Sequence, residues 1–543
     1  MALPGIARVV GAAVCLFFAA GAPGAELWLY VSENLQVSDR VERLEKLFVR
    51  AKQAGYTHVL LSDSKFSRLG AVPDVYFKNV ARVRDSARGN HLELVPAVFP
   101  VGYSNDLLWN DPDLAEGPPV RGARFVVRGG VARLESEAAP RLRGGDFSDL
   151  KAWDWKDDTI RSEDGAVVIR DPRGANARIV QRVKLLPWRQ YHFSVRVRTR
   201  DFRGQPEVKV LAADGGRALN FDHLGVAQTQ EWRTHHVVFN SLQYTQVGVY
   251  LGAWGADSGE LRFDDAMLEE VGLLNLVRRD GAPLLVRSPD GRELKEGMDF
   301  EPVRDPRMGH VQWPGDYDVH HESPVIRMRG EWPENTELRV SYQHVASIYD
   351  GQVMMDIAEP KSGLLLRDQA RRVHEIFRAP GYFMSHDEIR VLGWSDAFRR
   401  AGRTPGQLVG DNARLCVGYL HELAPGARVY SWSDMFDPHH NAVPGPYYLV
   451  NGSLSGSWEG LDPSVIVMNW NHGKRDESLR FFSERGHRQL IAGYYDNPME
   501  ELDQWLVSAR GVKGVLGYMY TTWRADFDKL EAFAKRVREG GGK

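Results

Sequence analysis

Cysteine is nearly absent from this chain, with two residues in 543. Cys15 lies in an apolar stretch near the first residue, so Cys416 is the only thiol expected after processing. A single thiol excludes an internal disulfide scaffold and a thiolate metal cluster. The sequence also lacks a His-Glu-x-x-His motif, so we expect no catalytic metal and no cofactor for catalysis.

An excess of charge of one sign is also missing. The chain has 69 lysines and arginines against 72 aspartates and glutamates, for a formal net charge of −3. This balance produces no field able to hold a polyanion, so nucleic acid and anionic membranes are excluded as expected partners.

Long apolar runs are confined to the first residues. Residues 1–25 contain Arg8, then an apolar run over 9–20, then small residues up to Ala25. This order is typical of a signal peptide, and the run is too short to span a bilayer. We therefore predict a secreted or periplasmic protein that is cleaved near Ala25 and then has no membrane contact. An uncleaved anchor is the alternative.

The pattern of secondary structure changes twice along the chain. Short β-type segments alternate with helical patterns at both ends, whereas the middle shows only β patterns separated by turn residues. We predict an α/β fold, a (β/α)8 TIM-type barrel interrupted after strand 3 by an all-β jelly-roll sandwich and a second small β domain. The predicted parts are a signal peptide (1–25), the first part of the barrel (26–143), the sandwich (145–271), the small β domain (272–344) and the remainder of the barrel (345–540).

About eight principal barrel strands are expected, beginning with 27–31, 59–61 and 92–99. A short segment at 353–357 is an optional ninth strand. Helices are predicted over 39–54, 75–88, 367–377, 405–423 and 526–538 from their 3.6-residue periodicity.

Carboxylates and aromatic side chains gather where these predicted strands end. A barrel of this kind builds its active site at the carboxyl ends of its strands. Carboxylates supply the acid and the base or nucleophile for glycoside cleavage, and aromatic faces match the apolar face of a sugar ring. The candidate residues are Glu33, Asp63, Glu359, His386, Asp387, Glu388, Trp432, Asp434, Trp470, Tyr494, Asp496 and Trp523.

The segment IFRAPGYFMSHDEI, at 376–389, resembles the signature of the family 20 glycoside hydrolases, the β-hexosaminidases. This resemblance implies that Glu388 is the general acid and that Asp387 orients a 2-acetamido group of the substrate. It further implies that the acetamido carbonyl attacks the anomeric carbon, giving retention without an enzyme nucleophile.

The resemblance extends to later strands of the barrel. It implies that Trp432 and Trp523 wall the sugar, and that Tyr494 and Asp496 bind the acetamido group and a ring hydroxyl. The chain departs from the family in strand one, LWLYVSEN, which has no arginine to hold sugar hydroxyls, and at Ala525, where the family has an acid.

Adjacent residues on a regular strand point to opposite faces. Asp387 and Glu388 can therefore serve one pocket only if the strand twists or ends there. Otherwise one of them makes a structural bridge, for example to Arg390. His386 fits a structural histidine as well as a sugar contact, and isolated acids such as Glu33 are commonly solvated or salt-bridged.

Residues 145–271 resemble carbohydrate-binding modules of families 4 and 9. The likeness lies in the opening GDF, the middle QRVKLLPWRQYHFSVRVRT and the closing LRFDDAMLEEV. It implies a jelly roll in which some aromatics bind sugar and others are core, and a structural calcium with Asp265 as a ligand. The histidine pairs at 320–321 and 439–440 predict no shared metal, because adjacent histidines rarely point at one ion.

Taken together, the sequence predicts an exported glycoside hydrolase with an oligo- or polysaccharide substrate, favouring a retaining exo-hexosaminidase-like activity. A glycan-binding or scaffolding protein with a degenerate, inactive barrel is one alternative. The other is a glycosidase that acts on another sugar through a carboxylate nucleophile such as Glu359 or Asp434.

Overall fold

The computed structural model describes residues 24–213, 216–309 and 315–540. Apart from its last two residues, the predicted signal peptide (1–25) lies outside these ranges. Among the helices of the described ranges, none combines the length and the apolar character needed to cross a bilayer.

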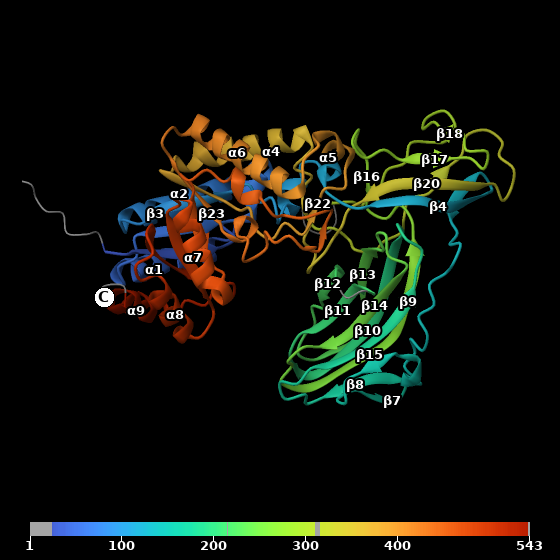
Figure 1. The fold of residues 1–543 in the computed structure, drawn as a ribbon, viewed down its shortest axis with the longest axis horizontal. Coiled ribbons are helices and arrows are strands. Elements are labelled where there is room, and N and C mark those ends of the chain that lie inside the picture. The colour runs from blue at the N-terminus through green and yellow to red at the C-terminus, as the bar shows by residue number, and fades with distance from the viewer. Residues whose placement is uncertain (1–23, 214–215, 310–314, 541–543) are drawn as a thin grey trace, which may run out of the picture.

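Eight parallel strands close into a barrel at the left of Figure 1. Side chains alternate along each strand, so Leu29 and Val31 of β1 pack outward, whereas Trp28 packs inside the barrel with Tyr430 and Met519. In barrel order the strands are β1 (Glu26–Ser32), β2 (His58–Ser62), β3 (Glu93–Val98), β21 (Gly381–Met384), β23 (Arg428–Trp432), β25 (Ile466–Asn469), β26 (Gln489–Tyr495) and β27 (Val515–Thr521).

Most of the helices lie around the outside of this barrel (Figure 1). The first helix buries Val41, Leu44 and Phe48 on one face, as its periodicity predicts. In the described ranges the α-helices are α1 (Ser38–Gln53), α2 (Asp74–Gly89), α3 (Asn105–Leu108), α4 (Pro360–Phe377), α5 (Asp396–Ala401), α6 (Pro405–Leu423), α7 (Arg475–Glu484), α8 (Met499–Ser508) and α9 (Leu530–Gly540).

The predicted fold class, an α/β (β/α)8 TIM-type barrel, is wrong. Within the described ranges the chain forms 27 strands and nine α-helices, so it is mostly β. Its closed parallel barrel does not have a helix after each of its strands. The connection from β23 to β25 contains only the 3-10 turns η5 (Asp434–Phe436) and η6 (Ser457–Gly460) and the short strand β24 (Leu449–Val450). Prolines at 438, 444 and 446 account for this, because proline removes a helical hydrogen-bond donor.

The optional ninth strand at 353–357 does not form. Only Met355 makes an isolated bridge there, with Ala115 outside the barrel.

Two five-stranded sheets form a β-sandwich, at the lower right of Figure 1. Its core includes Tyr191, Phe193, Val208 and Leu251. One sheet has the order β13 (Gln230–Asn240), β10 (Gln190–Arg203), β15 (Ser258–Val271), β8 (Ala166–Arg170) and β7 (Arg161–Glu163). The other has the order β12 (Ala218–His223), β11 (Pro206–Ala212), β14 (Gln246–Ala253), β9 (Ala177–Lys184) and β6 (Trp155–Lys156).

A seven-stranded sheet lies above the sandwich in Figure 1. Some of its strands precede the sandwich in the sequence and the others follow it. Residues 119–134, placed in the barrel by the sequence pattern, instead supply two of its strands, because Phe125 and Val127 pack with Leu338 and Val340 in a separate core. The strands are β18 (Glu293–Leu294), β17 (Leu285–Arg287), β20 (Glu337–His344), β4 (Pro119–Arg128), β5 (Val131–Leu134) and β19 (Ile326–Arg327), with β16 (Leu276–Val277) beside β20. Finally, β22 (Val391–Leu392) pairs with β24 near the barrel.

Candidate active site

The carboxyl ends of the barrel strands surround a cavity of about 680 Å³. This position is where parallel barrels place their ligands, and the volume suits a sugar-sized ligand. Six of the predicted site residues line it: Asp63, Asp387, Glu388, Trp432, Trp470 and Trp523.

Asp387 and Glu388 both face the cavity because the regular strand ends before them. β21 stops at Met384, and Glu388 takes a left-handed backbone conformation with φ of 46°. This turn breaks the strand alternation that would send the two side chains to opposite sides. A non-glycine residue at such a φ costs about 1–3 kcal/mol, and such strain is concentrated at functional sites.

The carboxyl group of Glu388 is held in place by two neighbours. Arg390 Nη2 lies 2.8 Å from Glu388 Oε1, and the Tyr103 hydroxyl donates a hydrogen bond to Glu388 Oε2. Arg390 is itself fixed, since its Nη1 donates to Gln352 Oε1 at 2.6 Å and its guanidinium lies 3.8 Å from the centroid of the Tyr349 ring. The bridge to Arg390 foreseen as an alternative therefore exists, yet Glu388 still lines the cavity.

Asp387 has the opposite electrostatic environment. Burial, with the neighbouring negative charges of Asp434 and Glu388, raises the pKa of Asp387 well above its ordinary value. Asp434 is fully buried, and its Oδ2 accepts hydrogen bonds of 2.9 Å from the Glu388 backbone N–H and from Asn441 Nδ2. Burial also raises the pKa of Asp434. The cavity thus pairs Asp387, whose pKa is raised by burial and by neighbouring carboxyl groups, with Glu388, which is ion-paired with Arg390.

Aromatic rings form another part of the cavity lining. The ring centroid of Trp523 lies 5.1 Å from that of Tyr30 and 6.2 Å from that of Trp432. Trp432 is buried, whereas Trp523 is 56% exposed, so its ring remains free to contact a ligand. Trp470 completes this part of the lining beside Tyr495.

Six of the predicted site residues do not line the cavity: Glu33, Glu359, His386, Asp434, Tyr494 and Asp496. His386 is fully buried and its Nε2 lies 2.9 Å from Asn412 Oδ1, and burial lowers its pKa to about 4, as suits a neutral structural histidine. Tyr494 packs between Tyr520 and Phe533. Asp496 accepts a hydrogen bond of 2.8 Å from the Trp523 backbone N–H and thus positions the segment that carries that ring.

The isolated acids differ from one another. Glu33 forms an ion pair with Arg40 at 2.7 Å, and Glu359 precedes α4; neither lines the cavity. Asp63 lines it, but its carboxylate also accepts hydrogen bonds from Tyr76 and from two backbone N–H groups. Asp63 therefore shapes the cavity mainly by fixing the loop after β2.

Sequence reasoning missed several lining residues, notably Tyr30, Tyr103, Tyr349 and Tyr495, as well as Arg390 behind Glu388. The strand alternation that places Trp28 inside the barrel could have indicated Tyr30. Tyr103 and Tyr349 lie on connections whose course depends on the whole fold.

Asp265 remains a predicted ligand of a structural calcium. Its side chain is half-exposed and pairs with Arg196 at 2.8 Å. Within the described ranges, no cluster of three acids or histidines close enough to share an ion includes Asp265. Calcium prefers six to eight oxygen ligands.

Comparison with known proteins gives no match to a family model and none to a curated protein. Partial similarity to solved structures exists. A CBM4 structure is 18% identical over 21% of this chain and 77% of its own, with a TM-score of 0.19. A family 16 carbohydrate-binding module is 16% identical over 23% of this chain and 96% of its own, with a TM-score of 0.18.

A chitobiase of Flavobacterium johnsoniae is 15% identical over 36% of this chain, with a TM-score of 0.27, and the match spans 30% of the chitobiase. At these identities and scores the chain has limited likeness to carbohydrate-binding and carbohydrate-cleaving proteins, and its family is not established.

Proposed function

We propose that this protein is a glycoside hydrolase that cleaves a sugar bound in the barrel cavity. The observation that carries the proposal is the cavity of about 680 Å³ that Asp387 and Glu388 line together with Trp432, Trp470 and Trp523. Glycoside cleavage needs a proton donor, a negative charge beside the anomeric carbon and a surface for the sugar ring. These three elements converge here.

The environment of the two carboxyl groups suggests their roles. Asp387, with its raised pKa, is suited to protonate the leaving glycosidic oxygen. Glu388, ion-paired with Arg390, is suited to stabilise the positive charge that develops at the anomeric carbon. This assignment reverses the roles that the family 20 resemblance implies, in which Glu388 is the acid.

The finer parts of the proposal concern substrate and location. An N-acetylhexosamine is the favoured sugar, because its acetamido carbonyl supplies the nucleophile and leaves Glu388 free to act by charge alone. The sandwich is proposed to bind the same glycan, with Trp155 as a candidate contact since its side chain is 46% exposed while Trp153 is core. We also propose that the protein is exported to the periplasm or out of the cell.

A panel of aryl glycosides that includes the N-acetylglucosaminide tests the activity. We expect wild type to cleave at least one member, and Asp387→Asn and Glu388→Gln each to lose about 10²–10⁴-fold in kcat. Glu33→Gln is the matched control, because Glu33 lies at a strand end but not in the cavity. Full activity in both cavity variants, or no cleavage of any member by wild type, would overturn the proposal.

The panel also separates the two roles. A leaving group of low pKa needs no protonation, so variants of the true acid recover on activated aryl glycosides. Recovery is expected for Asp387→Asn and not for Glu388→Gln. Recovery of Glu388→Gln instead would support the roles that the family resemblance implies, with Glu388 as the acid.

A second candidate function is glycan binding without cleavage. It is favoured by one observation: Tyr103 and Arg390 together occupy both oxygens of Glu388. Calorimetric titration with chito-oligosaccharides distinguishes the two, since binding with no release of product supports this candidate.

A further inference from the structure

The outer face of one sandwich sheet carries a row of histidine and carboxylate side chains. Tyr191, Phe193 and Phe239 point to the core, so the alternate residues of these strands point outward. On the outer face, His192 of β10 lies directly opposite Glu269 of β15, and His236 of β13 lies diagonally across from it, opposite Ser194. Such cross-strand neighbours are close enough to interact.

The side chains are oriented toward one another. His192 Nδ1 lies 2.9 Å from Glu269 Oε1, and His192 Nε2 lies 2.9 Å from His236 Nδ1. If His192 donates its Nδ1 hydrogen to the carboxylate, its Nε2 presents a lone pair toward His236. A carboxylate that accepts from the remote nitrogen is the usual partner of a metal-bound histidine.

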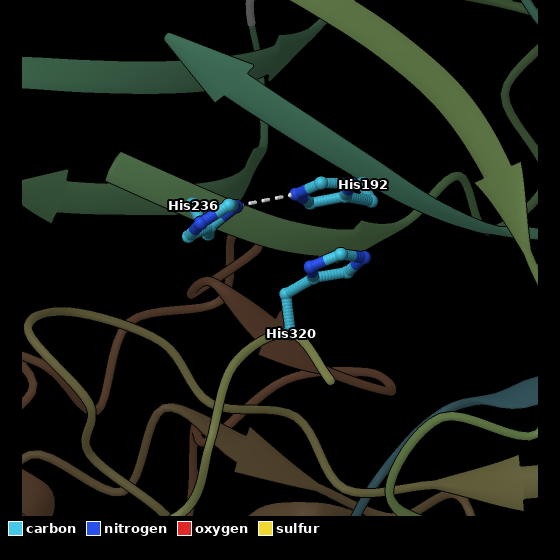
Figure 2. Close-up of side chains that lie close together, drawn as sticks. All are labelled: His192, His236 and His320. Atoms are coloured by element: carbon cyan, nitrogen blue, oxygen red, sulfur yellow. Dashed lines mark hydrogen bonds between the residues drawn. The ribbon is translucent and has the colours of Figure 1, made fainter. Parts of the chain in front are cut away.

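A third histidine reaches this row from a loop of the adjoining β region (Figure 2). The ring of His320 stacks on that of His192, with centroids 3.7 Å apart and an interplanar angle of 5°. The next residue, His321, is buried against Asp305, with Nε2 and Oδ2 2.9 Å apart, and this contact fixes the loop. His320 therefore faces the sandwich while its neighbour is held elsewhere.

The three rings offer nitrogen atoms that all lie within 4.8 Å of one another. Histidine binds a metal ion through the lone pair of a ring nitrogen, so three such nitrogens gathered in one place can share an ion.

We infer that His192, His236 and His320 form a binding site for a divalent transition metal, with zinc as the expected ion. Imidazole ligands suit zinc, and three histidines with a water complete its tetrahedral coordination. This site is separate from the cavity with Asp387 and Glu388 and does not depend on glycoside cleavage. Its ligands come from two strands and one loop, so the metal would fasten that loop to the sandwich.

Binding requires two local changes. A histidine lone pair lies in the plane of its ring, so two rings stacked face to face cannot both point at one ion, and the His320 ring must turn out of the stack. The hydrogen bond of 2.9 Å between His192 and His236 must also open, because zinc–nitrogen bonds of about 2.0 Å set a spacing of about 3.3 Å between the nitrogens. Side-chain rotations can make both changes without moving a strand.

The test is a calorimetric titration of the full chain with ZnCl₂ after treatment with a chelator. We expect one zinc per chain and a higher Tm with zinc, since a ligand of the folded state stabilises it. His320→Ala should abolish the one-to-one binding and the Tm rise without unfolding the sandwich, because this residue lies on a loop. Glu269→Gln should weaken affinity about 10–100-fold through the orientation of His192.

The matched control is His235→Ala, since His235 neighbours His236 on β13 but points to the other face of the sheet. It should bind zinc as wild type does. Cobalt(II) gives a second readout, because a site with three nitrogens and a water should give the intense visible absorption of tetrahedral cobalt. The inference is overturned by absence of stoichiometric binding in wild type, or by equal binding in wild type and His320→Ala.

Discussion

Substitution of one glycine should disable the candidate active site without touching a carboxyl group. Gly102 lies on the connection after β3, and a Cβ atom built there would lie 1.7 Å from the backbone oxygen of Asp387. An ordinary contact begins at 3.4 Å, so in Gly102→Ala the Asp387 peptide must move by about 1.7 Å. The obstacle is backbone, which cannot rotate aside as a flexible side chain would.

The size of the effect follows from this displacement. Misplacement of a reacting group by about 1 Å can cost roughly 100-fold in rate, so a shift of this size should reduce kcat/KM by at least about that factor. The assay is kcat/KM on the best aryl glycoside, together with Tm and far-UV circular dichroism. We expect a folded protein with a modest fall in Tm, because small-to-large substitutions typically cost about 1–3 kcal/mol.

Gly418→Ala is the matched control. Gly418 lies inside α6, and a Cβ atom there would contact nothing within 4 Å. This variant should keep full activity and gain a little stability, since alanine favours a helix by about 0.5–1 kcal/mol over glycine. If Gly102→Ala retained both the rate and the Tm of wild type, the placement of the Asp387 peptide against Gly102 would be refuted.

Three other perturbations probe the same structure. Asp434→Asn removes a negative charge that raises the pKa of Asp387, so the basic limb of the kcat/KM profile should move to lower pH; an unchanged limb would contradict the electrostatic assignment. Trp523→Ala should raise KM for a small glycoside about two- to tenfold, from a stacking energy of about 0.5–1.5 kcal/mol, whereas Phe77→Ala, which removes an exposed ring outside the cavity, should not. Burial raises the pKa of Glu116 from 4.5 to about 8, so the folded protein binds a proton that the unfolded chain does not, and stability falls as pH rises from 4.5 to 8. In Glu116→Gln, Tm should fall less over this pH range than in wild type. The same dependence of Tm on pH in both proteins would refute this assignment.

The sequence predicts those elements whose pattern is local. The helix expected over 405–423 matches α6, which begins with a capping box between Thr404 and Gln407, a signal written in adjacent residues. Five strands of the seven-stranded sheet lie in the β domain predicted over 272–344, but the part played by β4 and β5 was not predicted, because Phe125 pairs with Leu338 across the whole length of the sandwich in sequence. Nothing in either segment alone specifies such a distant partner.

The candidate site shows the same division at the level of single side chains. The family 20 resemblance implies that Tyr494 contacts the sugar, yet Tyr495 lines the cavity. The pairing of β26 with β27 shifts between Ile491 and Tyr494, and an irregularity of one residue exchanges the two faces of a strand. This shift depends on the pairing of strands in the complete fold. The sequence could therefore predict a tyrosine at the rim, but not which of the two adjacent tyrosines lines the cavity.

The placement of Asp387 and Glu388 in one cavity depends on three segments that are distant in sequence. Asp434 accepts from the Glu388 backbone N–H, Gln352 Nε2 donates to the Glu388 backbone oxygen at 3.0 Å, and Gly102 leaves room for the Asp387 oxygen. Hydrogen bonds to both the N–H and the oxygen of the Glu388 backbone can hold it at a left-handed φ that the same residue would rarely adopt in a free peptide. Asp434 has a double effect, since the carboxylate that fixes the Glu388 backbone also disfavours the charge on Asp387. The contact that shapes the pair therefore also makes its two carboxyl groups different, which is the property that acid-assisted glycoside cleavage requires.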